Sequence, residues 1–131
     1  MLTKIKVSDY MSTTLVTLTE STNIFEAIKT MAEARITSAP VINEASQMVG
    51  MFSERDCMNA AICATYNQVA GGGVGEYMSS GIMSIKAESS ILEAANQFNS
   101  SHIRSLPVYD DVGLVGIISR TDVLRAIATF H

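Results

Sequence analysis

The hydrophobic positions of this chain change their period several times, and these changes predict helices and strands. The spacing i, i+3, i+4, i+7, which is typical of a helix with one buried face, occurs twice: at Ile24, Ala27, Ile28 and Met31, and at Ile91, Ala94, Ala95 and Phe98. A polar residue precedes each helix, with a glutamate three positions later: Asn23 with Glu26, and Ser90 with Glu93. This spacing predicts an N-terminal cap on both helices.

Shorter apolar runs predict strands and a second pair of helices. Residues 39–43 and 48–53 predict two adjacent strands joined by a turn, as do residues 106–109 and 114–119, and residues 15–18 form a further β-rich run. A helix is predicted after each strand pair. The buried sides of these two helices are predicted to hold Met58, Ala61 and Ile62 in the first, and Leu124, Ile127 and Ala128 in the second.

The chain is an internal repeat. Residues 7–12, Val-Ser-Asp-Tyr-Met-Ser, recur at residues 74–79 as Val-Gly-Glu-Tyr-Met-Ser, a shift of 67 residues. Each half is predicted to be β-α-β-β-α, so the fold class is α/β (α+β). The predicted domains are a first repeat with its lead-in at 1–65, a glycine-rich linker at 66–73 and a second repeat at 74–131. Because some 60 residues bury little surface alone, we expect the halves to share one core.

Composition excludes several classes of protein. Of the 131 residues, 47% are hydrophobic and 17% charged, which is typical of a folded domain, and the net charge of −4 argues against nucleic-acid binding. No apolar run approaches the roughly 20 residues that cross a bilayer, so no membrane association is expected. Cys57 and Cys63 have neither CxxC nor zinc spacing, which favours reduced thiols in a cytoplasmic protein. No catalytic constellation or metal centre is suggested, and we expect no enzymatic activity.

Residues 50–56 and 116–122 share the pattern Gly, two apolar residues, Ser, two variable residues, Asp. Each stretch joins a predicted strand to a predicted helix. Unpaired N–H groups and the helix dipole at such a junction favour negative charge and can hold a phosphate. The alternative is that the serine and the aspartate only cap the helix.

The ordered set of motifs resembles a tandem pair of cystathionine β-synthase (CBS) domains, often called a Bateman module. The features that carry the resemblance are Val-x-x-Tyr-Met-Ser in each lead-in, Ile-x-Glu-Ala in each first helix, Pro-Val in the second strand, and Gly-h-h-Ser-x-x-Asp, where h is apolar. They occur twice, from Val7 to Thr129, and we expect a stand-alone pair without a catalytic domain. The resemblance implies pseudo-two-fold symmetry and two clefts between the repeats.

The resemblance also implies a ligand that contains adenosine: AMP, ADP, ATP or S-adenosylmethionine, with magnesium as a potential companion and no obligatory cofactor. Carried onto this sequence, the ribose and phosphate contacts would be Ser53 and Asp56 in one cleft, and Ser119 and Asp122 in the other. The candidates for phosphate contact are Arg35, His102 and Arg104, and the alternative for them is a solvated cation at a helix end. The residues expected to line the clefts are Ala39, Pro40, Leu106 and Pro107.

The expected function is regulatory. A ligand between the halves would change their relative angle, and with it the surface offered to a protein partner that the sequence does not identify. The alternative is a ligand-independent dimerisation or protein-interaction module. The resemblance implies a homodimer with meeting helical faces, to which the apolar residues of the two second helices would contribute if they are not core.

Overall fold

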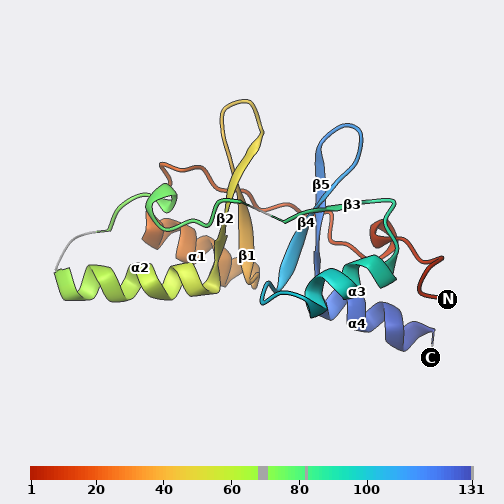
Figure 1. Ribbon diagram of the computed structural model, residues 1–131. Helices are drawn as coiled ribbons and strands as arrows, with labels where there is room; N and C mark the ends of the chain where they lie inside the picture. The colour runs from red at the N-terminus through yellow and green to blue at the C-terminus, as the bar shows by residue number, and fades with distance from the viewer. Residues whose placement is uncertain (68–70, 82, 131) are drawn as a thin grey trace. The chain divides into compact units, whose positions relative to one another are not determined.

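The computed structural model describes residues 1–67, 71–81 and 83–130, and it confirms the predicted α/β (α+β) class (Figure 1). The elements of the first half are the 3-10 helix η1 (Val7–Asp9), α1 (Ile24–Ala34), β1 (Ser38–Ile42), β2 (Met48–Ser53) and α2 (Glu54–Asn67). Those of the second half are η2 (Val74–Glu76), β3 (Ile85–Lys86), α3 (Ile91–Asn99), β4 (Ser105–Tyr109), β5 (Leu114–Ser119) and α4 (Arg120–Thr129). None of the helices within the described residues is long and apolar enough to cross a membrane.

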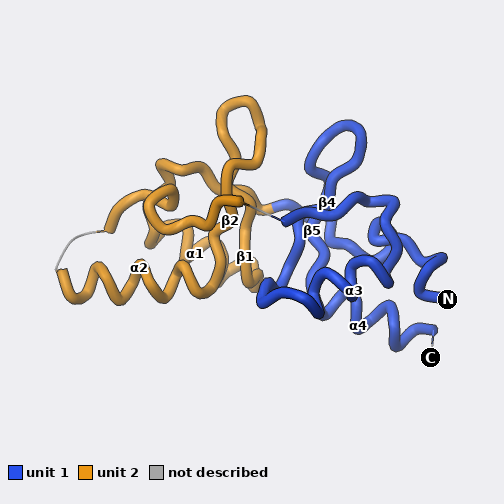
Figure 2. The backbone as a smooth tube through the Cα atoms, viewed as in Figure 1, with its two compact units in different colours: residues 1–15, 83–131 blue, residues 16–82 orange. Residues whose placement is uncertain are grey.

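The chain forms two compact units that do not follow the order of the repeats (Figure 2). Unit 1 combines Met1–Leu15 with Met83–His131, and unit 2 is Val16–Ile82. The lead-in of the first repeat therefore belongs with the second repeat, and the lead-in of the second belongs with the first. The predicted boundaries at 1–65, 66–73 and 74–131 follow the repeats in the sequence. In the compact units, each repeat packs with the lead-in of the other repeat.

Unit 2 contains the antiparallel pair β1–β2. Ser38 lies opposite Ser53 and Val41 opposite Gly50, with an irregularity before Ile42. The β-rich run predicted at 15–18 contributes only an isolated parallel bridge between Leu18 and Val41. The core of this unit consists of buried residues of α1, β1, β2 and α2 together with Leu18 and Val74.

Unit 1 repeats this arrangement with a longer first strand. β3 pairs in parallel with β4, and β4 pairs antiparallel with β5, placing Ser105 opposite Ser119. Ile85 pairs with Val108 at the position that Leu18 and Val41 occupy in unit 2. Ile5 and Val7 of the lead-in join Ile91, Leu106 and other residues of the second repeat in one core.

A glycine at the start of each Gly-h-h-Ser-x-x-Asp stretch allows a lead-in to lie against the strand. Ser12 donates to Ile117 O over 2.8 Å and accepts from Ile117 N over 3.0 Å. A Cβ on Gly116 would lie 2.7 Å from Ser12 O, which is closer than real contacts of this kind. In unit 2 the backbone of Met51 pairs with that of Ser79, and a Cβ on Gly50 would meet the Met78 side chain. The motif thus needs glycine for close backbone approach.

The predicted buried faces of α2 and α4 were wrong for Met58, Ile62 and Leu124, which are exposed, whereas Ile127 packs partly buried against the core of unit 1. The buried residues are Asp56, Ala60 and Ala64 in α2, and Val123 and Ala126 in α4. Met58 and Leu124 are each 64% exposed. The small inward side chains allow α2 and α4 to pack closely against their neighbours, which leaves the larger apolar side chains on the opposite face.

Candidate functional site at the strand–helix junctions

The junction between β2 and α2 holds Ser53 and Asp56 in direct contact. Asp56 Oδ2 accepts from Ser53 N over 2.9 Å and from Ser53 Oγ over 3.0 Å. Asp56 N donates to Ser53 Oγ over 3.4 Å. Asp56 is only 8% exposed, which is unusual for a carboxylate without a cationic partner. Its other oxygen, Oδ1, has no hydrogen-bond partner among the described residues.

The junction between β5 and α4 repeats the backbone contacts. Ser119 N donates to Asp122 Oδ2 over 2.9 Å, and Asp122 N donates to Ser119 Oγ over 3.2 Å, which is a capping box. Ser119 and Asp122 therefore cap α4, which leaves contact with a ligand open to them as well. The predicted caps Asn23 and Ser90 are confirmed as well, because each side chain accepts from backbone N–H groups in the first turn of its helix.

The first N–H groups of both helices already have protein acceptors. Glu54 N donates to Thr37 O over 2.9 Å, and Arg120 N donates to Arg104 O over 3.1 Å. Together with the two aspartates, these bonds use much of the anion-binding capacity that a bare helix start offers. The groups that remain for a ligand are mainly the serine hydroxyls and the aspartate carboxylates.

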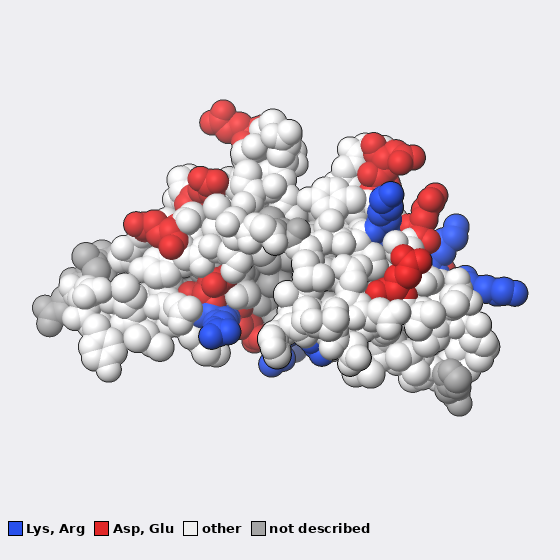
Figure 3. All heavy atoms as spheres, in the orientation of Figure 1, with Lys and Arg blue, Asp and Glu red and all other residues white. Residues whose placement is uncertain are grey.

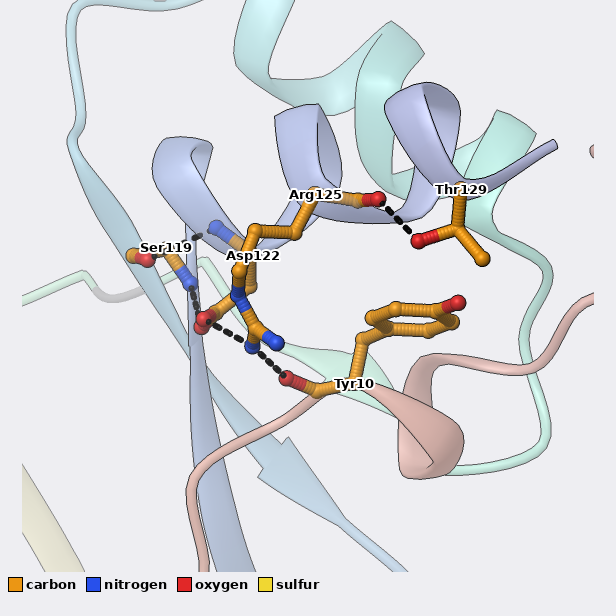
Figure 4. Close-up of polar contacts among 5 residues, drawn as sticks. All are labelled: Tyr10, Ser119, Asp122, Arg125 and Thr129. Carbon is orange, nitrogen blue, oxygen red and sulfur yellow. Dashed lines mark hydrogen bonds and ion pairs between the residues drawn. The ribbon is translucent and has the colours of Figure 1, made fainter. Parts of the chain in front are cut away.

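The two junctions differ in what lies beside the aspartate, and Figure 4 shows the contacts at the second one. Arg125 Nη2 donates to Asp122 Oδ1 over 2.9 Å and to Tyr10 O over 3.3 Å, and its guanidinium lies 5.7 Å from the centre of the Tyr10 ring. The corresponding position in α2 is Asn59, three residues after Asp56. Arg125 was missed in the sequence, although the spacing Asp122-x-x-Arg125 on a helix is a known signal for an ion pair.

The three predicted phosphate-contact candidates occupy different places. Arg35 ends α1 as its C-cap in the left-handed conformation, with φ of 56° and an exposed side chain. His102 and Arg104 are exposed in the segment between α3 and β4. Only Arg104 adjoins a junction, because its carbonyl accepts from the first residue of α4.

Arg120 has a structural contact that the sequence did not suggest. Its guanidinium donates to the carbonyls of Phe98, Ser101 and Ile103, each over 2.8 Å, and lies 5.7 Å from the centre of the Phe98 ring. These bonds fasten the segment after α3 to the start of α4. The corresponding residue at the other junction is Glu54.

The predicted cleft-lining residues are buried within the strands. Ala39 and Leu106 are core residues with no exposed surface, and Pro40 and Pro107 are also fully buried. Any contact of these four residues with a ligand therefore falls to their backbone groups.

Charge is divided unequally between the units. Unit 1 carries six Lys or Arg and six Asp or Glu residues, whereas unit 2 carries three basic and seven acidic residues, so the whole net charge of −4 lies in unit 2. On the face drawn in Figure 3, most Lys and Arg atoms lie over unit 1. The field around the Ser119–Asp122 junction is thus more favourable to an anion.

The cysteines are free thiols in unit 2. Burial, followed by the charges of Asp56 and Glu54, raises the pKa of Cys57, whose Sγ lies 3.8 Å from Met31 Sδ. A hydrogen bond with Cys63 raises the pKa of Tyr77. Neither thiol is activated as a nucleophile by a neighbouring cation. Among the described residues, no group of three or more His, Cys, Asp or Glu side chains could hold a metal ion.

This fold, with Ser-x-x-Asp junctions in two similar units, defines a tandem repeat of one small domain. The family model of the CBS domain matches residues 7–62 and 74–129. The chain belongs to the CBS domain family, as a pair of such domains.

Relatives and solved structures agree with this membership. The structure of CBSX2 from Arabidopsis thaliana in complex with AMP is 27% identical, with a TM-score of 0.82 over 96% of this chain and 98% of that one. The uncharacterized protein MJ1225 of Methanocaldococcus jannaschii is 27% identical over 94% of this chain and 43% of its own length. The γ-3 subunit of the 5′-AMP-activated protein kinase of Bos taurus is 28% identical over 86% of this chain and 24% of its own length. The chain thus spans less than half of these two curated relatives.

Proposed function

We propose that this chain is a regulatory ligand-sensing module that binds an adenosine-containing ligand at its Ser-x-x-Asp junctions, with AMP as the first candidate. The observation that carries the proposal is the buried Asp56 carboxylate, one oxygen of which has no partner among the described residues. An ionised carboxylate only accepts hydrogen bonds, so this oxygen suits a ribose hydroxyl. Membership of the CBS family and the AMP complex of the 27% identical CBSX2 support the choice of ligand.

Each predicted contact has a place in this proposal. Ser53 and Asp56 bind the ribose at one junction, and Ser119 and Asp122 bind it at the other. Arg104 is the first candidate for phosphate contact because its backbone adjoins the start of α4, ahead of Arg35 and His102. Magnesium would arrive with the phosphates of ADP or ATP.

The proposed action is regulatory and not catalytic. A ligand shifts the balance between two conformations only by its difference in affinity for them, and the favoured conformation is then read by a protein partner. The cysteine content favours a cytoplasmic location for this module.

A thermal-shift panel of AMP, ADP, ATP, S-adenosylmethionine and NAD, with and without magnesium, tests the proposal. A ligand at 100 times its dissociation constant adds about 2.7 kcal/mol to the free energy of unfolding. Asp56→Ala and Asp122→Ala, titrated by calorimetry, then separate the junctions. The absence of any shift at millimolar concentration, or unchanged affinity in both folded variants, contradicts the assignment.

A second candidate function, homodimerisation, has its own observation. Met58, Ile62 and Tyr66 repeat every four residues on the exposed face of α2, with exposed fractions of 64%, 56% and 84%, and Leu124 on α4 is 64% exposed. An apolar stripe of this kind is typical of an interaction surface. Light scattering on the wild type is expected to give a dimer mass, and Met58→Glu with Ile62→Glu a monomer. A monomeric wild type that still binds AMP leaves only the ligand-sensing function.

A further inference from the structure

The residue three positions after the aspartate differs between the two junctions: it is Arg125 in α4 and Asn59 in α2. Each oxygen of the Asp122 carboxylate accepts one hydrogen bond, Oδ2 from Ser119 N and Oδ1 from Arg125 Nη2. At the first junction Asp56 Oδ2 takes both bonds from Ser53, and Asn59 stands where α4 has Arg125. Within the described part of the chain, Asp122 has a cation beside its carboxylate and Asp56 has none.

We infer that Arg125 gates the second junction: a ribose hydroxyl that approaches Asp122 Oδ1 competes with the guanidinium that already donates to this oxygen. This inference rests on the proposed function and names the regulation of the same site. The Arg125 side chain is 60% exposed, so it can swing into water without leaving a buried cation. The gate is therefore weak enough to open when a ligand arrives.

The same guanidinium connects the site to the lead-in. It donates to Tyr10 O and lies over the Tyr10 ring, and Tyr10 directly follows η1 (Figure 4). Displacement of Arg125 from Asp122 removes one of the groups that hold its position over Tyr10. Ligand binding at Asp122 is thereby coupled to the freedom of the lead-in, and the coupling is reciprocal.

The test uses variants in which one junction binds. In the Asp56→Ala background, Arg125→Asn installs the residue of the first junction and is expected to raise AMP affinity about two- to fivefold, the worth of an exposed ion pair. The converse change, Asn59→Arg in the Asp122→Ala background, is expected to lower AMP affinity by a similar factor. Lys86→Asn is the matched control, because it removes a positive charge from unit 1 away from both junctions and should leave affinity unchanged.

Amide hydrogen exchange distinguishes a gate from a purely structural role of Arg125, because a structural role would not make the exchange rate depend on AMP. With Asp56→Ala, saturating AMP is expected to speed exchange in residues 6–12, and Arg125→Asn is expected to abolish that effect. Equal or lower AMP affinity in Arg125→Asn, with the fold intact by circular dichroism, overturns the gate while leaving the proposed function in place. Failure of the wild type and of both single-junction variants to bind AMP overturns the gate and the choice of AMP together.

Discussion

The two strand–helix junctions share a backbone and differ in their outer polar groups. In both, a serine ends the strand and an aspartate three residues later accepts from the serine N–H over 2.9 Å. The residues around these shared contacts differ between the repeats. Glu54, Cys57 and Asn59 of α2 correspond to Arg120, Val123 and Arg125 of α4. The duplication has thus kept the groups that start a helix and varied those that decide charge and access.

The two junctions should differ in the ligands that they prefer. The first junction offers an open carboxylate oxygen in an acidic unit, and the second offers a gated carboxylate in a unit with balanced charge. Neutral and anionic ligands should therefore rank the two sites differently. Sequence similarity between the repeats does not make the sites equivalent.

The largest expected difference between the units concerns the glycines under the lead-ins. Gly116→Ala places a Cβ 2.7 Å from Ser12 O, a backbone atom that cannot turn away. A Cβ on Gly50 lies closest to the flexible Met78 side chain, and its nearest backbone atom, Ser79 O, is 3.0 Å away. We expect Gly116→Ala to lower the free energy of unfolding by about 2–3 kcal/mol and Gly50→Ala by about 1 kcal/mol. Urea denaturation of both variants measures the difference, and equal losses would show that the Ser12 backbone yields as readily as Met78.

A smaller difference is expected from the first residues of α2 and α4. Arg120→Ala removes three hydrogen bonds to carbonyls and the contact with Phe98, so it should cost about 1–2 kcal/mol of unfolding free energy. The matched variant Glu54→Ala should stay within about 0.5 kcal/mol of wild type. Thermal and urea unfolding measure both variants. A neutral Arg120→Ala would mean that water replaces the guanidinium at these carbonyls without cost.

The smallest expected effect is on the free energy of unfolding at alkaline pH, and it comes from Cys57 in unit 2. Burial raises the pKa of Cys57 above its ordinary value of 9.0, so the folded state favours the protonated thiol. The stabilisation from this group is therefore present below about pH 9 and is lost as the pH rises through the folded-state pKa. Cys57→Val installs the residue of the second repeat and should remove this part of the alkaline slope in urea unfolding between pH 8 and about 11. Identical slopes in the two proteins would contradict the assignment to Cys57.

Much of the fold could be predicted because its signals are local. The helical spacing, the caps at Asn23, Ser90 and Ser119, and the repeat itself depend on residues close in sequence. The exchange of the lead-ins could not be predicted, because both carry the same Val-x-x-Tyr-Met-Ser pattern and neither pattern states which sheet it joins.

The Ser-x-x-Asp contacts shared by the two junctions could be predicted from the sequence, but the side-chain contacts that differ between the junctions could not. Ser-x-x-Asp announces a cap at any helix start, so both aspartates were found from sequence. The exposed faces of α2 and α4 were misassigned because periodicity identifies an apolar stripe without saying whether it faces the core. The ion pair of Arg125 was overlooked because a charged residue on a helix most often points into water.

The exchanged lead-ins have a consequence for the order in which the chain is synthesised. Unit 2 is one continuous segment, Val16–Ile82, and its pieces are all present once that segment has left the ribosome. Residues 1–15 leave the ribosome before unit 2, yet the sheet they join is not made until residues 83–131 follow. Because domains fold as units during synthesis, residues 1–15 must stay unpaired while unit 2 is made and become ordered only with residues 83–131.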